Sequence, residues 1–107
     1  MESWQRIERG RAEVLTVRST EDLEIEVEVE VPLSAAPPTE WRAHFSSIAR
    51  PPLLPGHLSP PTLNGAVLSF QAPRDNVGDY LIALDELIVL ANDEFERKAK
   101  AIELNQD

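Results

Sequence analysis

The chain contains no cysteine, which excludes disulfide bonds, thiol chemistry and thiolate metal sites. It also lacks a long apolar run, because its longest candidate, Tyr80 to Leu90, is interrupted by Asp85 and Glu86. A membrane span needs roughly 18 apolar residues, so we predict no membrane contact. The first ten residues, MESWQRIERG, hold no apolar core of a secretory signal. We therefore expect a cytoplasmic protein.

Positive charge is scarce as well. The 107 residues include 10 basic and 19 acidic side chains, which gives a net charge of −9. Nucleic-acid binders normally present a basic stripe, and none is visible, so we predict no nucleic-acid binding. Residues 21–31 hold six acids and no base. Since charge distribution steers encounters, this asymmetry favours a basic protein partner, although the acids can equally serve for solvation.

Motifs for catalysis, metal binding or nucleotide binding are missing too. The serines carry no nucleophile-elbow pattern, and the two histidines, His44 and His57, lack the ligand spacing of a zinc site. We interpret both histidines as structural and expect no metal or cofactor. The competing hypothesis joins His44 or His57 to carboxylates for acid–base chemistry.

The clearest pattern that is present is LEIEVEVEV, residues 23–31, in which apolar residues alternate with glutamates. This alternation predicts a strand with one covered face and one face in water. Residues 12–18 should pair with it as an antiparallel hairpin, with Arg18 opposite Asp22 or Glu24. The wet face is either ordinary solvated surface or a surface for a basic partner. Metal binding is disfavoured, since carboxylates in a flat row cannot wrap an ion. The residues of this wet face are Glu24, Glu26, Glu28 and Glu30.

Helical periodicity appears twice. Trp41, Phe45 and Ile48 share one face of a predicted helix, with Thr39 as its N-cap. Five prolines in residues 50–61 indicate a stiff crossover to a third strand, residues 62–72. A long helix should then follow from residue 77 to about residue 102.

These elements predict an α+β fold in a single domain, residues 1–107, with the order β-β-α-β-α. The sheet should be mainly antiparallel and three-stranded, with the long C-terminal helix packed on one face. Leu84 and Phe95 are expected near the centre of the packed stripe, and Glu86 on the opposite side of the helix.

Some apolar residues remain without an expected partner inside the chain. Ile82, Val89 and Leu90 lie off the main helical stripe, which predicts a homodimer through the C-terminal helix. Trp4 either packs inward or contacts a partner. We thus expect a non-catalytic, acidic, self-associating protein-interaction module, of the inhibitor, immunity or adaptor type. The alternative is a small enzyme or enzyme subunit with a site at an oligomer interface. The candidate partner-binding residues are Glu24, Glu26, Glu28, Glu30, Ile82, Val89, Leu90 and Trp4.

Overall fold

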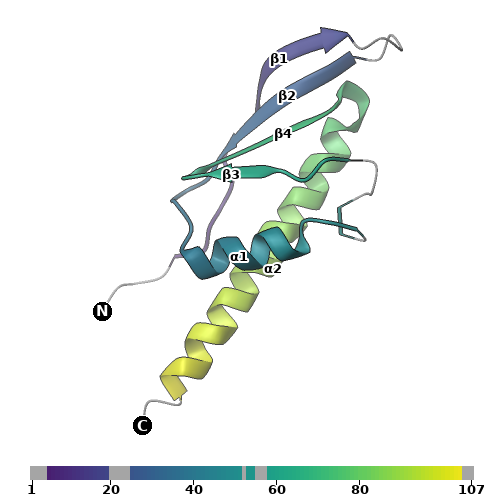
Figure 1. Ribbon diagram of the computed structural model, residues 1–107. Coiled ribbons are helices and arrows are strands. Elements are labelled where there is room, and N and C mark those ends of the chain that lie inside the picture. The colour runs from purple at the N-terminus through teal and green to yellow at the C-terminus, as the bar shows by residue number, and fades with distance from the viewer. Residues whose placement is uncertain (1–4, 20–24, 52, 55–57, 105–107) are drawn as a thin grey trace.

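Four strands and two helices succeed one another in the computed structural model, which describes residues 5–19, 25–51, 53–54 and 58–104. A short 3-10 helix, η1, precedes the last helix, and the whole has the predicted α+β class (Figure 1). The elements are β1 (Glu13–Ser19), β2 (Ile25–Pro32), α1 (Thr39–Ile48), β3 (Thr62–Asn64), β4 (Val67–Pro73), η1 (Arg74–Asn76) and α2 (Val77–Leu104).

The strands form one antiparallel sheet in the order β1-β2-β4-β3. The strand β1 therefore lies at one edge, and the sequence-distant strand β4 is the inner neighbour of β2. The prediction of three strands was wrong, because residues 62–72 are a hairpin and not one strand. Asn64 pairs with Val67 across a two-residue turn whose first position, Gly65, has φ 63°. Glycine adopts this left-handed conformation at no steric cost, which is why the chain reverses here.

The core lies between the sheet and α2. Alternate residues of β2 and β4 point into it, as the alternating pattern predicted, and they meet the apolar stripe of α2. The rings of Phe70 and Tyr80 stack with centroids 3.8 Å apart and an interplanar angle of 6°. Leu84 is fully buried, whereas Phe95 is only partly buried and lies at the margin of the core.

The shorter helix, α1, packs on α2 through Trp41 and Phe45, which are buried and stacked on each other. Its predicted N-cap was wrong. Thr39 is already helical, and Pro38 occupies the capping position with no side-chain cap hydrogen bond. The carbonyl of Pro38 accepts the first helical bond, from the Arg42 N–H, at 3.0 Å. The extended backbone of Pro38 thus sets the start of the helix, a role that requires no hydroxyl.

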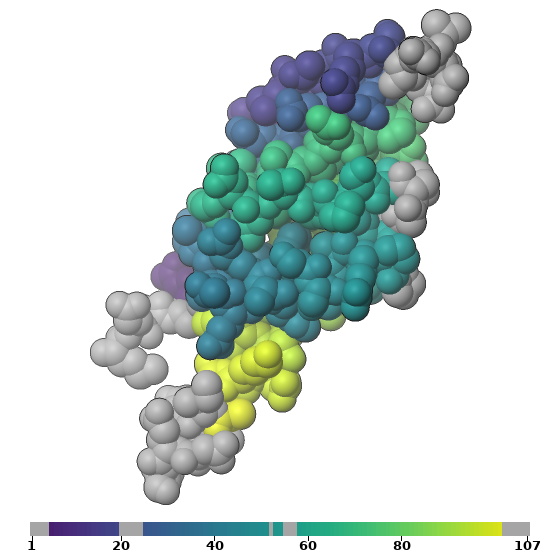
Figure 2. All heavy atoms as spheres, in the orientation of Figure 1, coloured from purple at the N-terminus to yellow at the C-terminus, as the bar shows by residue number. Residues whose placement is uncertain are grey.

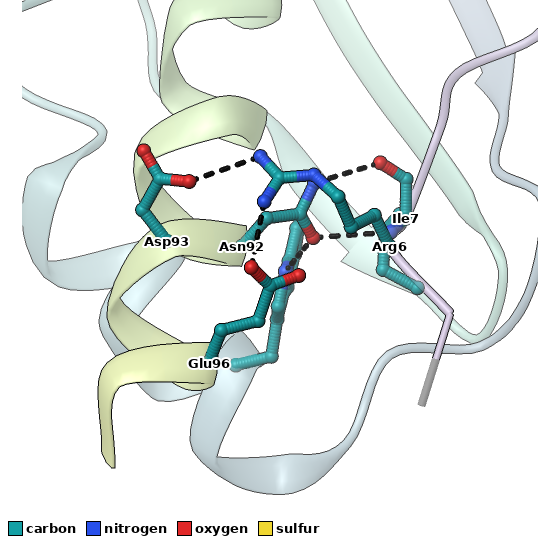
Figure 3. A network of polar contacts seen from close by, with 6 residues as sticks. Arg6, Ile7, Asn92, Asp93 and Glu96 are labelled. Atoms are coloured by element: carbon teal, nitrogen blue, oxygen red, sulfur yellow. Dashed lines mark hydrogen bonds and ion pairs between the residues drawn. The ribbon is translucent and has the colours of Figure 1, made fainter. Parts of the chain in front are cut away.

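The segment that leads into β1 is bound to α2 by a polar network (Figure 3). Asn92, which is 2% exposed, accepts the Ile7 N–H at 3.0 Å and donates to the Ile7 carbonyl at 2.9 Å. The same Asn92 oxygen accepts the indole N–H of Trp41 at 2.9 Å. One helical side chain therefore ties α1, α2 and the N-terminal segment together.

Two arginines strengthen the same attachment from outside. Arg6 donates to Asp93 at 3.0 Å and to Glu96 at 2.7 Å, and Arg9 forms an ion pair with Asp85. These hydrogen-bonded carboxylates raise the pKa of both arginines. Because this segment runs straight on into β1, the network fixes where the edge strand begins.

Candidate functional site

The edge strand β1 is exposed along its whole length, although its neighbour β2 is mostly covered. All seven residues of β1 are exposed, whereas Val27 and Val29 on β2 are buried. The exposed fractions of Val14, Leu15 and Val17 are 55%, 50% and 59%. In the part of the chain that the structure describes, β1 pairs with β2 and with no other strand. Its outer edge runs along a margin of the molecule (Figures 1 and 2), so apolar side chains and unpaired backbone groups are presented together.

A β-bulge at Leu15 controls which way the side chains of β1 point. Val14 lies opposite Val29, but Thr16 lies opposite Glu28, so Leu15 is an extra residue in the ladder. In an unbroken strand, Val14 and Val17 would point to opposite faces, because they are three residues apart. The bulge instead places both valines on the core side of the sheet, opposite Val29 and Val27. The valines thus extend the apolar face beyond the part that α2 covers.

The other face of the sheet carries the glutamates. Glu26, Glu28 and Glu30 on β2 are half-buried between the side chains of neighbouring strands, so they are less exposed than a freely solvated row. Glu13 on β1 lies directly opposite Glu30. We call the four residues Glu13, Glu26, Glu28 and Glu30 the glutamate face. The four strands, as described, contain one basic residue, Arg18.

Arg18 contacts a different acid from the one expected. The hairpin register places Arg18 opposite Glu26, and its Nη2 donates to Glu26 at 3.1 Å and to Gln71 at 3.3 Å. The predicted partners, Asp22 and Glu24, lie outside the described residues. The guanidinium therefore reaches across β2 to β4, and its side chain is still 61% exposed. Near it the face is hollowed by a shallow depression bounded by Thr16, Arg18, Glu26, Glu28 and Gln71.

The predicted contact residues of the C-terminal helix separate into two groups. Ile82 and Val89 are 69% and 48% exposed, and Val89 lies beside the segment of Arg6 to Arg9. Leu90 is half-buried on the opposite flank, next to His44. Successive helical residues are rotated by about 100°, so Val89 and Leu90 cannot share one narrow contact. Trp4 and Glu24 lie outside the described residues.

Of the two histidines in the enzyme alternative, His44 belongs to the described residues and His57 lies outside them. His44 is half-buried in an open depression with Glu94 and Arg97. Arg97 donates two hydrogen bonds to Glu94, at 2.6 and 3.0 Å, and these lower the pKa of the Glu94 carboxyl. The nearby carboxylate is thus ionised and already engaged.

The sequence interpretation missed two features that shape this surface. Asn92 follows Ile88 by one helical turn, and a polar residue at the edge of an apolar stripe is a signal for a buried hydrogen bond. Val14 and Val17 are both apolar but three residues apart, and two such residues share one face of a strand only where a bulge adds a residue between them.

Among the residues described, no helix combines the length and apolarity needed to cross a membrane. Nor do these residues include a group of three or more histidines or acids placed to hold a metal ion.

No family model matches this chain, and no curated protein or solved structure matches it either.

Proposed function

We propose that this chain is a non-catalytic protein-interaction module that self-associates and presents its glutamate face to a basic partner. The observation that carries this proposal is the charge of the open sheet face. Four glutamates lie there with Arg18, while α2 packs on the opposite face. Such a surface can occlude a positively charged site on another protein, as an inhibitor, immunity protein or adaptor would.

The arrangement of the glutamates supports a basic partner. Like charges directly opposite each other on paired strands are destabilising, and Glu13 and Glu30 are such a pair. In the described structure Glu13, Glu28 and Glu30 have no basic hydrogen-bond or ion-pair partner. A lysine or arginine from another protein would convert this repulsion into attraction. The same charge would accelerate encounter, and the acceleration would weaken as salt is added.

The competing hypothesis, an enzyme site at an oligomer interface, has less support. It requires His44 or His57 to work with a carboxylate, and the carboxylate next to His44 is Glu94. That group is held by Arg97, which favours its ionised form. A group poised for proton transfer at neutral pH would instead need its pKa shifted toward 7.

The proposal can be tested by affinity capture from the native host with three baits. These are the wild type, a double variant of the glutamate face (Glu28→Lys, Glu30→Lys) and a matched control (Asp79→Lys, Glu86→Lys). Asp79 and Glu86 are exposed on α2, so the control changes the net charge by the same amount. Captured proteins are identified by mass spectrometry and their binding is repeated with purified protein.

We expect a basic protein that binds the wild type and the control, binds the glutamate-face variant much less, and is released by salt. Equal binding of one partner to all three baits would contradict the proposal.

A further inference from the structure

We propose that the occupant of the open β1 edge is a second copy of this chain. The two β1 strands pair antiparallel, with Val14 opposite Val17 of the second copy and Glu13 opposite Arg18 of the second copy. The result is one continuous eight-stranded sheet. This inference rests on the self-association in the proposed function and names its surface and register.

The first support is that β1 is built as an open edge. Proteins commonly protect edge strands with lysine, proline, inward-pointing charges, a bulge or a covering element, and of these devices β1 has the bulge at Leu15. The seven residues of β1, EVLTVRS, include neither lysine nor proline, and in the described structure nothing covers them. Three apolar side chains are about half exposed on this one strand. A paired strand would satisfy the outer backbone groups and bury these side chains.

The second support is the symmetry that the bulge creates. Glu13 and Arg18 at the two ends lie on the glutamate face, and Val14 and Val17 lie on the core side. The bulge residue Leu15 and Thr16 stand between the two valines. This order is the same in both directions about the peptide bond between Leu15 and Thr16. A two-fold axis there brings each valine against a valine on the same face. A slip of one residue would set Val14 against Arg18, which points to the other face.

The third support is charge complementarity. In this register the two-fold axis brings Arg18 of the second copy beside Glu13, and repeats the contact on the other side. Glu13 lies against Glu30 within its own chain, and its side-chain carboxylate makes no hydrogen bond or ion pair in the described structure. Arg18 uses one guanidinium nitrogen, Nη2, for its bonds to Glu26 and Gln71 and keeps a largely exposed side chain. Two Glu–Arg contacts thus oppose the repulsion between two acidic chains.

Charge reversal tests this register specifically. Sedimentation of the wild type at high micromolar concentration should show a dimer. Glu13→Arg places Arg against Arg at both contacts, and Arg18→Glu places Glu against Glu, so each should weaken the homodimer about tenfold or more. A mixture of the two variants should form a heterodimer, because both contacts then join opposite charges. Glu40→Arg and Arg42→Glu, on exposed positions of α1, are the matched controls.

Folding of each variant is checked by circular dichroism, and the double variant Glu13→Arg with Arg18→Glu should recover the homodimer. A second readout needs no charge reversal. Since the chain has no native cysteine, Thr16→Cys beside the axis should be joined by a short thiol cross-linker, whereas Ser69→Cys on β4 should not.

Two results would overturn the inference. One is a monomeric wild type, and the other is a dimer whose charge-reversed variants fail to form a heterodimer on mixing. Neither result decides whether the glutamate face binds a basic partner, because the capture experiment tests that binding separately.

Discussion

The side-chain amide of Asn92 pairs with both backbone polar groups of Ile7, as the backbone of a neighbouring strand would. Its Oδ1 accepts the Ile7 N–H at 3.0 Å, and its Nδ2 donates to the Ile7 carbonyl at 2.9 Å. The amide thus satisfies backbone groups that would otherwise be buried without partners. Because the segment that contains Ile7 leads into β1, which begins at Glu13, this pairing links the position of the edge strand to the long helix.

Replacing Asn92 by alanine should cost about 3 kcal/mol or more of stability. The change leaves the Ile7 backbone groups and the Trp41 indole N–H buried and unpaired, at about 1–3 kcal/mol for each group. Arg6→Ala breaks exposed ion pairs next to the same site and should cost under about 1 kcal/mol. Urea denaturation of both variants measures the difference. Similar losses would show that Asn92 is not the anchor of this segment.

The helix orientation predicts unequal effects at Leu84 and Glu86. Leu84 is fully buried against the sheet, and Glu86 is exposed. Leu84→Ala should cost about 2–5 kcal/mol through lost burial and cavity formation, and Glu86→Ala should stay within about 0.5 kcal/mol. Thermal melts compare the two, and comparable shifts in Tm would contradict the described core.

Stability should fall at alkaline pH through Tyr80. Burial raises the pKa of Tyr80 well above its ordinary value of about 10, so the folded chain keeps a proton that the unfolded chain releases. The native state then binds more protons, and the free energy of unfolding decreases as pH rises above about 10. Because the chain has one tyrosine, tyrosinate absorbance reports this residue directly.

Two checks accompany this titration. Tyr80→Phe should flatten the alkaline decline, although it also loses the hydrogen bond to the Ser59 carbonyl and begins from lower stability. Tyrosinate that appears near pH 10 in the folded protein would mean that the ring is not buried as described.

The glutamate face predicts different responses to neutralisation at adjacent positions. Glu28→Gln removes a charge that repels its strand neighbours, so it should stabilise by a few tenths of a kcal/mol at low salt. Glu26→Gln also loses the ion pair with Arg18, which cancels the gain. Urea denaturation at low and high salt compares them. Equal stabilisation by both variants would contradict the Arg18–Glu26 pairing.

Local periodicity was enough to predict the main body of the fold. The alternation of residues 23–31 identified the covered and polar faces of β2, and the 3.6-residue period identified α2 and the burial of Leu84. These patterns repeat over many residues, so a single irregularity does not hide them. The α+β class followed from their order.

Features that depend on one residue were harder to predict. Gly65 reverses the chain inside what looked like one strand, although the Asn64-Gly65 pair is a known hairpin signal. Leu15 shifts the faces of β1 by a bulge, and Asn92 finds its partner 85 residues away. The exposure of β1 was also invisible in the sequence, since it depends on where α2 crosses the sheet.

The most direct measurement of the central claim, that β1 is a contact surface, is amide hydrogen exchange by mass spectrometry at low and high protein concentration. We predict that exchange in residues 13–19 slows as concentration rises, because the outer edge becomes paired. Exchange in residues 62–64 of β3, the other edge of the sheet, should stay constant. The opposite result would be amide exchange in β1 that does not depend on protein concentration and stays equally fast when a captured partner is present. That result would contradict the claim that β1 is a contact surface.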